Sequence, residues 1–213
     1  MERKITALKV QKKNPNRVNV YLDGEFAFGL TRIVAAWLSV GQALTPEKIN
    51  RLQAEESREA AYNRALLLLS YRPRSENEVR KKLVEKGIEE TVADAVIERL
   101  KENRYLGDDK FARDWIENRS TFRPRSRKML YYELRQKGVA EDHIQDALES
   151  VEDETELAYQ AGVKYARRLM GSDWETFRKR LAAFLGRRGF SYGTIAPTLR
   201  RIWSELQTEE QKT

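Results

Sequence analysis

The sequence predicts a mainly α protein: an elongated solenoid of three tandem three-helix repeats, preceded by a small N-terminal three-stranded β-meander with a helix. Three glycines at intervals of 51 residues, Gly87, Gly138 and Gly189, each follow a stretch of basic and apolar residues. The tetrapeptide Arg-Pro-Arg-Ser occurs at residues 72–75 and again at 123–126, at the same interval. Similarity at a fixed period is the sequence signature of stacked structural repeats.

Positions at this interval also carry matching apolar residues, as expected if each repeat buries the same helix faces. The matching sets are Val79, Leu130 and Leu181; Leu83, Leu134 and Leu185; Ile88, Val139 and Phe190; Ile97, Leu148 and Leu199; and Leu100, Val151 and Ile202. We therefore expect five regions: residues 1–55 as the β-module with helices, 56–106, 107–152 and 153–208 as the three repeats, and 209–213 as a polar tail.

Residues 4–30 alternate between apolar and polar side chains, which is typical of β-strands. Asn14–Asn16 predicts the first turn. Asp23–Gly24 predicts the second, because a two-residue hairpin turn needs positive φ, which glycine adopts without strain. In the third strand Phe26, Phe28 and Leu30 are expected on one side.

A three-stranded meander is at the lower limit of independent stability, so its apolar face needs a cover. Side chains at helical spacing are expected to supply that cover: Ile33, Val34, Trp37 and Leu38. Thr45 followed by Pro46 predicts a helix start, with a capping hydroxyl and a proline at the first helical position. The mostly polar stretch 47–59 is interpreted as a connector into the repeats.

Each repeat is expected to hold three helices. The first helices are predicted at 60–71, 109–121 and 153–169, and the third at 89–101, 141–151 and 191–206. Between them lies a basic helix that ends at the repeat glycine, which fits the left-handed position just past a helix end. Ser75 with Glu78 predicts a capping box for the first basic helix, and Ser126 is expected to cap the second.

The third repeat departs from the pattern, as terminal repeats often do. Residues 174–177 replace the Arg-Pro-Arg-Ser motif. Ser172 with Glu175 is the expected capping box there, so this basic helix should start earlier than its equivalents. Pro197 is expected to kink the last helix or to delay its start.

Composition excludes several classes of function. The chain has no cysteine, which rules out thiol catalysis, disulfides and cysteine–zinc sites. It has no signal-peptide pattern and no apolar run that could cross a bilayer, so a soluble, intracellular protein is expected. It lacks a phosphate loop, and its single histidine, His143, is interpreted as a surface or capping residue. No enzyme, cofactor or metal site is expected.

The charges are segregated between helices. Residues 119–137 hold seven basic side chains and one acidic one, Glu133, whereas residues 139–156 hold eight carboxylates and no Lys or Arg. Residues 164–188 again hold eight basic side chains, against Asp173 and Glu175. At roughly 100° per residue, Lys128 and Lys179 point about 160° away from the core positions Leu130 and Leu181.

A charged face on one isolated helix is usually only solvated. Here the segregation recurs in consecutive repeats, and a net charge of +7 favours an acidic partner, either phosphates or an acidic protein surface. Aromatic residues accompany the basic ones and are suited to stacking on bases, although packing between helices is the favoured interpretation for most of them. They are Tyr71, Phe122, Tyr131, Tyr132, Trp174 and Phe177.

With the repeats aligned, the chain resembles the RecX family of bacterial recombinase regulators. The resemblance covers nearly the whole chain and rests on the order and spacing of several stretches. They are Val10–Lys13, Tyr21–Gly29, Leu68–Gly87, Leu106–Ala112, Leu134–Val139 and Arg187–Tyr192.

The resemblance implies a cytoplasmic protein that binds the RecA recombinase, chiefly its filament on DNA. It also implies inhibition of RecA ATPase, strand exchange and co-protease activity, which tempers recombination and the SOS response. No catalytic residue is implied. The missing motif leaves the third repeat's part in the contact undefined.

We expect the contact to use a basic stripe on one side of the helical stack. The basic stripe consists of Arg72, Arg74, Arg123, Arg125, Arg127, Lys128, Arg135, Lys179, Arg187 and Arg188. The expected partners are the RecA filament and single-stranded DNA, bound directly or through the filament, and polar terminal helices favour a monomer. Two alternatives stay open: a general single-strand nucleic-acid binder without a RecA target, and a scaffold that binds neither.

Overall fold

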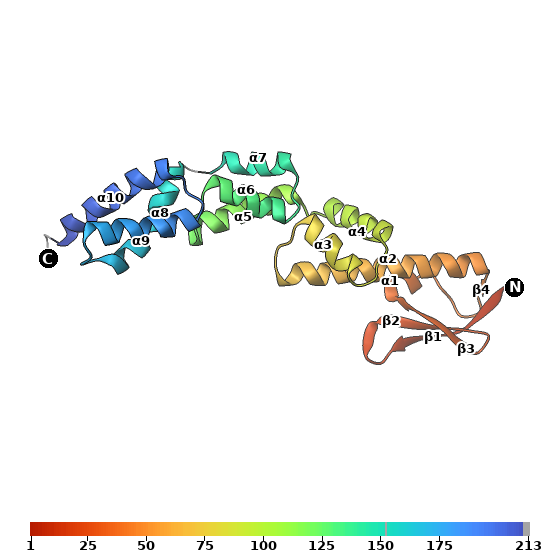
Figure 1. The fold of residues 1–213 in the computed structure, drawn as a ribbon. Coiled ribbons are helices and arrows are strands. Elements are labelled where there is room, and N and C mark those ends of the chain that lie inside the picture. Colours follow the sequence, from red (N-terminus) through yellow and green to blue (C-terminus); the bar gives the residue numbers. More distant parts are fainter. Residues whose placement is uncertain (152, 211–213) are drawn as a thin grey trace. The chain divides into compact units, whose positions relative to one another are not determined.

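The computed structural model describes residues 1–151 and 153–210, the last two by their backbone alone. The chain divides into two compact units. The first comprises Met1–Arg74 and Val79–Leu106, and the second comprises Ser75–Glu78 and Gly107–Thr213. Helices dominate both, with antiparallel strands only near the N-terminus of the described chain (Figure 1). The predicted mainly α class, with a small β-module ahead of repeated three-helix bundles, is confirmed.

The N-terminal sheet has the order β3-β2-β1-β4 and is antiparallel throughout (Figure 1). Its strands are β1 (Arg3–Gln11), β2 (Asn14–Leu22), β3 (Glu25–Thr31) and the two-residue β4 (Ala43–Leu44), which adds to the predicted meander. The turn at Asp23–Gly24 is confirmed, and both residues have positive φ, 52° and 92°. This pair of angles is what a type I′ hairpin requires.

Two details of the sheet differ from the prediction. The first turn lies at Lys12–Lys13, and Asn14–Asn16 already belongs to β2. Pro15 is tolerated there because β2 pairs with β3 only from Arg17 onward, and a register shift against β1 leaves the residues between Asn14 and Val18 unpaired on that side, so no paired position needs its missing N–H. In β3, Phe28 pairs with Val20 and Phe26 pairs with Tyr21, so a bulge lies between these two pairs. The bulge turns the Phe26 side chain outward, and that residue is 59% exposed.

The apolar face of the sheet is covered by parts of two helices. These are α1 (Arg32–Ala35) and the start of α2 (Pro46–Tyr71), whose Leu52 is buried against the sheet. Val34 and Leu38 contribute as predicted, but Ile33 and Trp37 are 61% and 88% exposed, since α1 lasts only one turn. The hydroxyl of Thr45 caps α2 by accepting from the Lys48 amide at 3.3 Å.

Helix α2 is continuous across residues 55 and 56, where the sequence suggested a change of region. Its first half packs on the sheet, and its second half buries Ala61, Tyr62 and Ala65 in a helical core. That core is completed by α3 (Glu76–Val84) and α4 (Glu90–Glu102). One helix therefore serves both hydrophobic clusters of the first unit.

The second unit has one contiguous core built from two three-helix sets. Its helices are α5 (Asp108–Phe122), α6 (Arg127–Gln136), α7 (Glu141–Glu149), α8 (Glu154–Ala166) with the 3₁₀ turn η1 (Arg167–Leu169), α9 (Trp174–Arg187) and α10 (Tyr192–Glu210). Leu130, Leu134, Leu181 and Leu185 are all fully buried in this core, as the 51-residue interval predicts.

The end of the chain differs in detail from the expectation. Pro197 lies inside α10, which starts at Tyr192, so the proline does not delay the helix. Residues 209 and 210, expected in a polar tail, belong to α10, and residues 211–213 lie outside the described residues. Helix α9 starts earlier than its equivalents, as predicted.

The cap of α9 is Asp173 and not the predicted Ser172. Its Oδ1 accepts from the amides of Glu175 and Thr176, at 2.9 and 3.0 Å. The amide and hydroxyl of Thr176 are the largest influences that hold the pKa of the Asp173 carboxyl below its ordinary value. A carboxyl with a depressed folded-state pKa stabilises the fold above its unfolded pKa, about 3.9, and loses that contribution as the pH falls through the folded value.

Acid stability should therefore depend on Asp173. In thermal melts from pH 7 to pH 3, Asp173→Asn is expected to lose less stability than the parent chain on acidification, because asparagine caps equally well and does not titrate. Asp114→Asn, on an exposed part of α5, controls for the change of charge. Parallel melting profiles for the parent and Asp173→Asn would contradict the assignment.

Candidate functional site

The serines of the two Arg-Pro-Arg-Ser motifs fix the starts of α3 and α6. Both serines are fully buried. The amide of Glu78 donates to Ser75 Oγ at 3.2 Å, and the Ser75 amide donates back to the Glu78 carboxylate at 3.3 Å. Ser126 Oγ accepts from the Met129 amide at 3.2 Å. The predicted capping box and cap are confirmed.

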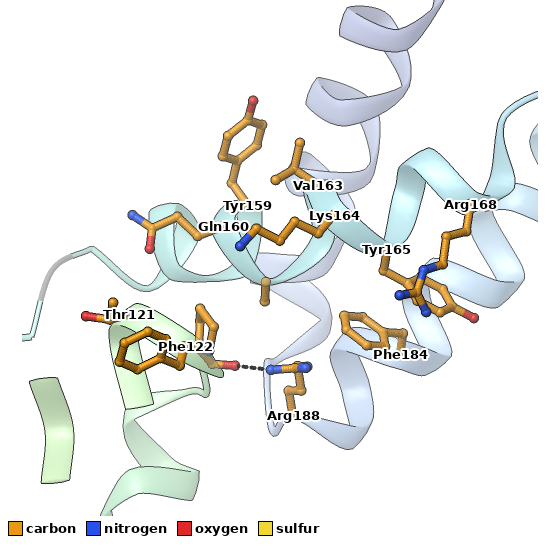
Figure 2. Close-up of a pocket in the computed structure, with 12 residues that line it drawn as sticks. Thr121, Phe122, Tyr159, Gln160, Val163, Lys164, Tyr165, Arg168, Phe184 and Arg188 are labelled. Atoms are coloured by element: carbon orange, nitrogen blue, oxygen red, sulfur yellow. Dashed lines mark hydrogen bonds between the residues drawn. The ribbon is translucent and has the colours of Figure 1, made fainter. Parts of the chain in front are cut away.

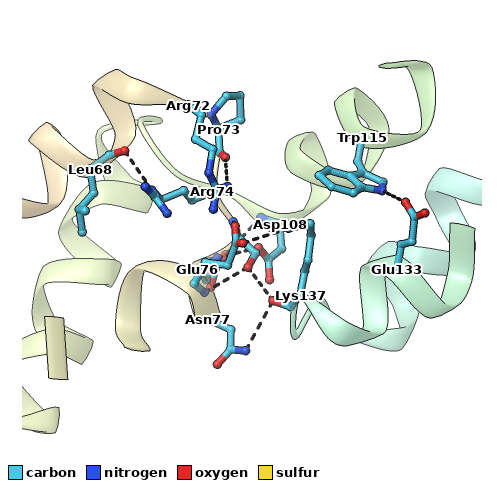
Figure 3. Close-up of polar contacts among 12 residues, drawn as sticks. Leu68, Arg72, Pro73, Arg74, Glu76, Asn77, Asp108, Trp115, Glu133 and Lys137 are labelled. Atoms are coloured by element: carbon cyan, nitrogen blue, oxygen red, sulfur yellow. Dashed lines mark hydrogen bonds and ion pairs between the residues drawn. The ribbon is translucent and has the colours of Figure 1, made fainter. Parts of the chain in front are cut away.

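Within the second unit the same serines make a further contact, which capping does not explain. Ser75 Oγ donates to the carbonyl of Lys137 at 2.6 Å, and the Ser126 amide donates to the carbonyl of Arg188 at 3.1 Å. Each acceptor directly precedes a repeat glycine. Figure 3 shows the polar contacts that gather at Lys137. Serine and glycine are thus paired at the same places in successive copies.

These close approaches give the repeat glycines a second role. A Cβ on Gly138 would lie 2.1 Å from Asn77 Nδ2, and one on Gly189 would lie 2.5 Å from Ser126 Oγ. All three repeat glycines have φ between +77° and +89°, as predicted. At Gly138 and Gly189, lack of a side chain is therefore needed for both backbone conformation and packing.

Both arginines of the first motif donate to a carbonyl in the first unit. Arg74 is half-buried, and its Nε donates at 3.0 Å to the carbonyl of Leu68 in the last turn of α2 (Figure 3). Arg72 donates to the carbonyl of Pro73 at 2.8 Å. Arg74 therefore satisfies one of the carbonyls that a helix end leaves without a partner.

In the second motif Arg125 is held by Glu133, the lone acidic residue of its basic segment. Arg125 Nη1 lies 2.6 Å from Glu133 Oε1, and Arg119 Nε donates to Glu133 Oε2 at 2.8 Å. Trp115 Nε1 also donates to Glu133 Oε2 at 2.8 Å (Figure 3). The Glu133 side chain is 13% exposed. One half-buried carboxylate thus pairs with two arginines, which leaves one net positive charge on the group, and Arg125 is not a free cation.

Removing this carboxylate should destabilise the second unit. Glu133→Ala is expected to lower the free energy of unfolding by about 2–3 kcal/mol in urea titrations, because Arg119, Arg125 and the Trp115 N–H would lose their acceptor together. The estimate is below that for a fully buried pair, since the arginines are 22% and 32% exposed. Glu149→Ala, at an exposed site on α7, is the control and should cost under about 0.5 kcal/mol. Equal losses would contradict this role.

Three arginines form what we call the guanidinium cluster: Arg123, Arg125 and Arg188. Arg188 comes near the other two although it lies 63 residues after Arg125 in the sequence. Arg188 Nη1 donates to the Pro124 carbonyl at 2.9 Å. The pKa of Arg188 is lowered, first by burial and then by the positive charges of Arg125 and Arg123. Because Glu133 balances Arg125, positive charge remains at Arg123 and Arg188, for which no carboxylate partner is found among the described residues.

The remaining members of the basic stripe in the second unit are on its surface. Lys128, Arg135, Lys179 and Arg187 are exposed, and Arg127 uses one nitrogen to donate to the Val151 carbonyl at 2.6 Å. Lys128 and Lys179 are exposed on helices whose Leu130 and Leu181 are fully buried, as the helical wheel predicts. Arg72 and Arg74 belong to the first unit.

The aromatic residues near the basic segments are more exposed than expected. Packing between helices holds for Phe177, which is fully buried, and partly for Tyr131. It also holds in part for Trp174, which is 38% exposed and packs against Phe177 and Trp203, with ring centroids 6.0 and 5.3 Å apart. It is wrong for the other three, which are 51–74% exposed: Tyr71, Phe122 and Tyr132. Several aromatic faces are therefore accessible beside the cations.

Comparison with known proteins identifies the family. Regulatory protein RecX of Bacillus subtilis (strain 168) is 33% identical over 216 residues, which cover 98% of this chain and 80% of that protein. The chain belongs to the RecX family. RecX of Clostridium perfringens (strain 13 / Type A) is also 33% identical, over 93% of this chain and 96% of the relative.

The RecX domain models match the chain in series. The RecX N-terminal domain matches residues 3–45, and the first, second and third RecX three-helix domains match 61–100, 108–148 and 152–199. A crystal structure of regulatory protein RecX superposes with a TM-score of 0.72 at 28% identity, covering 90% of this chain and 96% of that one. A crystal structure of RecX from Lactobacillus salivarius shares the fold, with a TM-score of 0.60 at 24% identity.

The described residues lack membrane-spanning helices and metal-binding clusters. Across residues 1–151 and 153–210, no helix has the length and apolar character needed to cross a bilayer. The same residues contain no group of three or more His, Asp or Glu side chains arranged to hold a metal ion. The RecX family is one of regulatory proteins.

Proposed function

We propose that this chain is a negative regulator of RecA that binds the RecA–DNA filament through the basic stripe. In doing so it inhibits ATP hydrolysis, strand exchange and co-protease activity, and so modulates recombination and SOS repair. The observation that carries the proposal is membership of the RecX family across nearly the whole chain. The protein acts by binding and not by catalysis, and it works in the cytoplasm, where the filament forms.

The electrostatics of the second unit support this proposal. Arg123, Arg188, Lys128 and Lys179 present positive charge that no internal carboxylate neutralises among the described contacts. A RecA–DNA filament offers phosphates and acidic side chains at regular intervals, so a protein with several cationic sites can engage it at more than one point. Linked contacts of this kind raise the overall affinity above that of each separate site.

One titration tests the function. RecA ATPase on single-stranded DNA is measured against increasing amounts of this protein, alongside its binding to the same DNA without RecA. We expect inhibition at concentrations well below that of RecA, with weak binding to bare DNA. A general single-strand binder would bind bare DNA tightly, with a log–log salt slope of about −3 to −4 for roughly five phosphates, and would inhibit only when it coats the DNA. A scaffold would show neither effect.

A further inference from the structure

A pocket of about 430 Å³ lies in the second unit, between the end of α5 and helices α8 and α9 (Figure 2). Its lining includes Phe122, Pro124, Lys164, Tyr165, Arg168 and Arg188. The size falls within the range of roughly 300–1,000 Å³ that is usual for small-ligand sites. The pocket adjoins the guanidinium cluster, because Arg188 belongs to both.

The pocket is suited to an anion. Three cations line it, Lys164, Arg168 and Arg188, and its lining contains no Asp or Glu within the described chain. Arg188 is held in place by its bond to the Pro124 carbonyl at 2.9 Å (Figure 2) and by the Phe184 ring, 4.5 Å from its guanidinium. A fixed guanidinium is well adapted to phosphate, because its planar set of donors matches phosphate oxygens.

One aromatic face at the pocket is unused. Tyr165 and Phe184 stack on each other, with ring centroids 4.2 Å apart and planes 2° from parallel. Phe122, the last residue of α5, is instead 74% exposed, and no other ring packs on it in the described part of the chain. A flat aromatic ligand group that covered this ring would remove apolar surface from water.

We propose that this pocket binds one nucleotide of single-stranded DNA, with its phosphate at Lys164, Arg168 and Arg188 and its base stacked on Phe122. Stacking on an aromatic side chain next to a positively charged groove is how proteins bind single strands without sequence preference. In a duplex both faces of each base are already covered by neighbouring bases, so the site selects single strands. Binding at this pocket requires no RecA, and it is a source of the weak binding to bare DNA expected above; the inference goes beyond the proposed function by naming the pocket and the nucleotide groups that it holds.

An acidic peptide is the competing ligand. Its carboxylates would pair with the three cations, but it has no group that needs the exposed ring of Phe122. Phosphate and base together account for both features of the pocket, which favours the nucleotide.

The first arm of the test addresses base stacking. Fluorescence anisotropy measures, without RecA, the binding of two labelled strands of equal length: an oligothymidine of about twelve nucleotides and an abasic strand. The parent chain should bind oligothymidine more tightly than the abasic strand. Phe122→Ala should weaken oligothymidine binding about tenfold and leave abasic binding unchanged. Phe122→Trp should restore the preference. Circular dichroism checks that the variants stay folded, which is expected because the Phe122 side chain is exposed.

The charge arm compares two double variants with the same net charge. The variant with both Lys164→Gln and Arg168→Gln should bind oligothymidine more weakly. The slope of log binding constant against log salt concentration should become shallower by about 1.4, as expected for two lost phosphate contacts on a single strand. Arg178→Gln with Arg200→Gln removes the same charge from a second pocket, which is lined by Glu175 as well. This control should bind nearly as the parent chain does.

Four results would overturn the inference. The first is equal loss of binding in the two double variants, and the second is an unchanged oligothymidine affinity in Phe122→Ala. The third is displacement of the strand by a polyglutamate peptide at lower concentration than by unlabelled oligothymidine. If the parent chain inhibits RecA ATPase but binds no bare oligothymidine, the nucleotide pocket fails while the RecA-directed function stands.

Discussion

Reversing the charge of Arg123, Lys128 and Lys179 together is expected to abolish inhibition of RecA ATPase at concentrations where the parent chain inhibits fully. These three side chains are exposed and belong to the second unit, which supplies most of the basic stripe. Replacing three attractive charges by three repulsive ones at an acidic surface weakens binding and slows association. The measurement is the concentration that gives half-maximal inhibition, which should rise at least tenfold.

The matched control reverses the charges of three exposed lysines in the first unit, Lys12, Lys13 and Lys48, and so reaches the same net charge. It should retain inhibition. Arg125 is left unchanged, because a carboxylate there would face Glu133 and destabilise the fold. Retained inhibition in the first variant, with helical content intact, would refute the basic stripe as the contact surface.

Gly189→Ala is expected to lower the free energy of unfolding of the second unit by about 3 kcal/mol. Alanine at a φ of +89° adopts the left-handed conformation, which costs roughly 1–2 kcal/mol. Its Cβ would also lie 2.5 Å from Ser126 Oγ and 3.0 Å from Met129 Cβ, so buried atoms must move at a further cost of about 1–3 kcal/mol. Urea unfolding monitored by circular dichroism measures the sum.

Gly171→Ala separates the two contributions. Gly171 lies in the same unit with a φ of +77°, and nothing is within 4 Å of the position of its Cβ. It should cost only the conformational part, about 1–2 kcal/mol. If the two variants unfold at the same urea concentration, the contact between Ser126 and the repeat glycine contributes nothing to stability.

Local sequence patterns predicted most of the fold. The glycine interval, the caps at Ser75 and Ser126 and the turn at Asp23–Gly24 each depend on a few adjacent residues, and all are as predicted. Two local predictions were off by one or two residues, namely the first turn and the cap of α9. The larger errors arose where distant packing decides. The bulge that turns Phe26 outward depends on the pairing of β3 with β2. Helix α2 continues unbroken because its first half packs on the sheet and its second half packs in the helical core.

The candidate site was predictable in kind but not in detail. Charge counting identified the basic segments, yet it treated Arg125 as free because a helical wheel does not show that Glu133 pairs with two arginines. The sequence did hold a signal for this pairing, because Glu133 is the one acidic residue in the basic segment 119–137. Arg188 meets Pro124 only through the tertiary fold, so neither the guanidinium cluster nor the pocket beside Phe122 could be read from spacing.

The division of α3 has a practical consequence for dissecting the protein. Its capping residue Ser75 and its first three residues, Glu76–Glu78, belong to the second unit, where Ser75 bonds to Lys137, while Val79 and Leu83 lie in the core of the first. A truncation that begins at Gly107 would therefore delete part of what it aims to isolate and leave the loop at Gly138 uncovered. Expression boundaries for the C-terminal half should begin upstream of Ser75, and fragments cut at the interval between repeats will understate its stability.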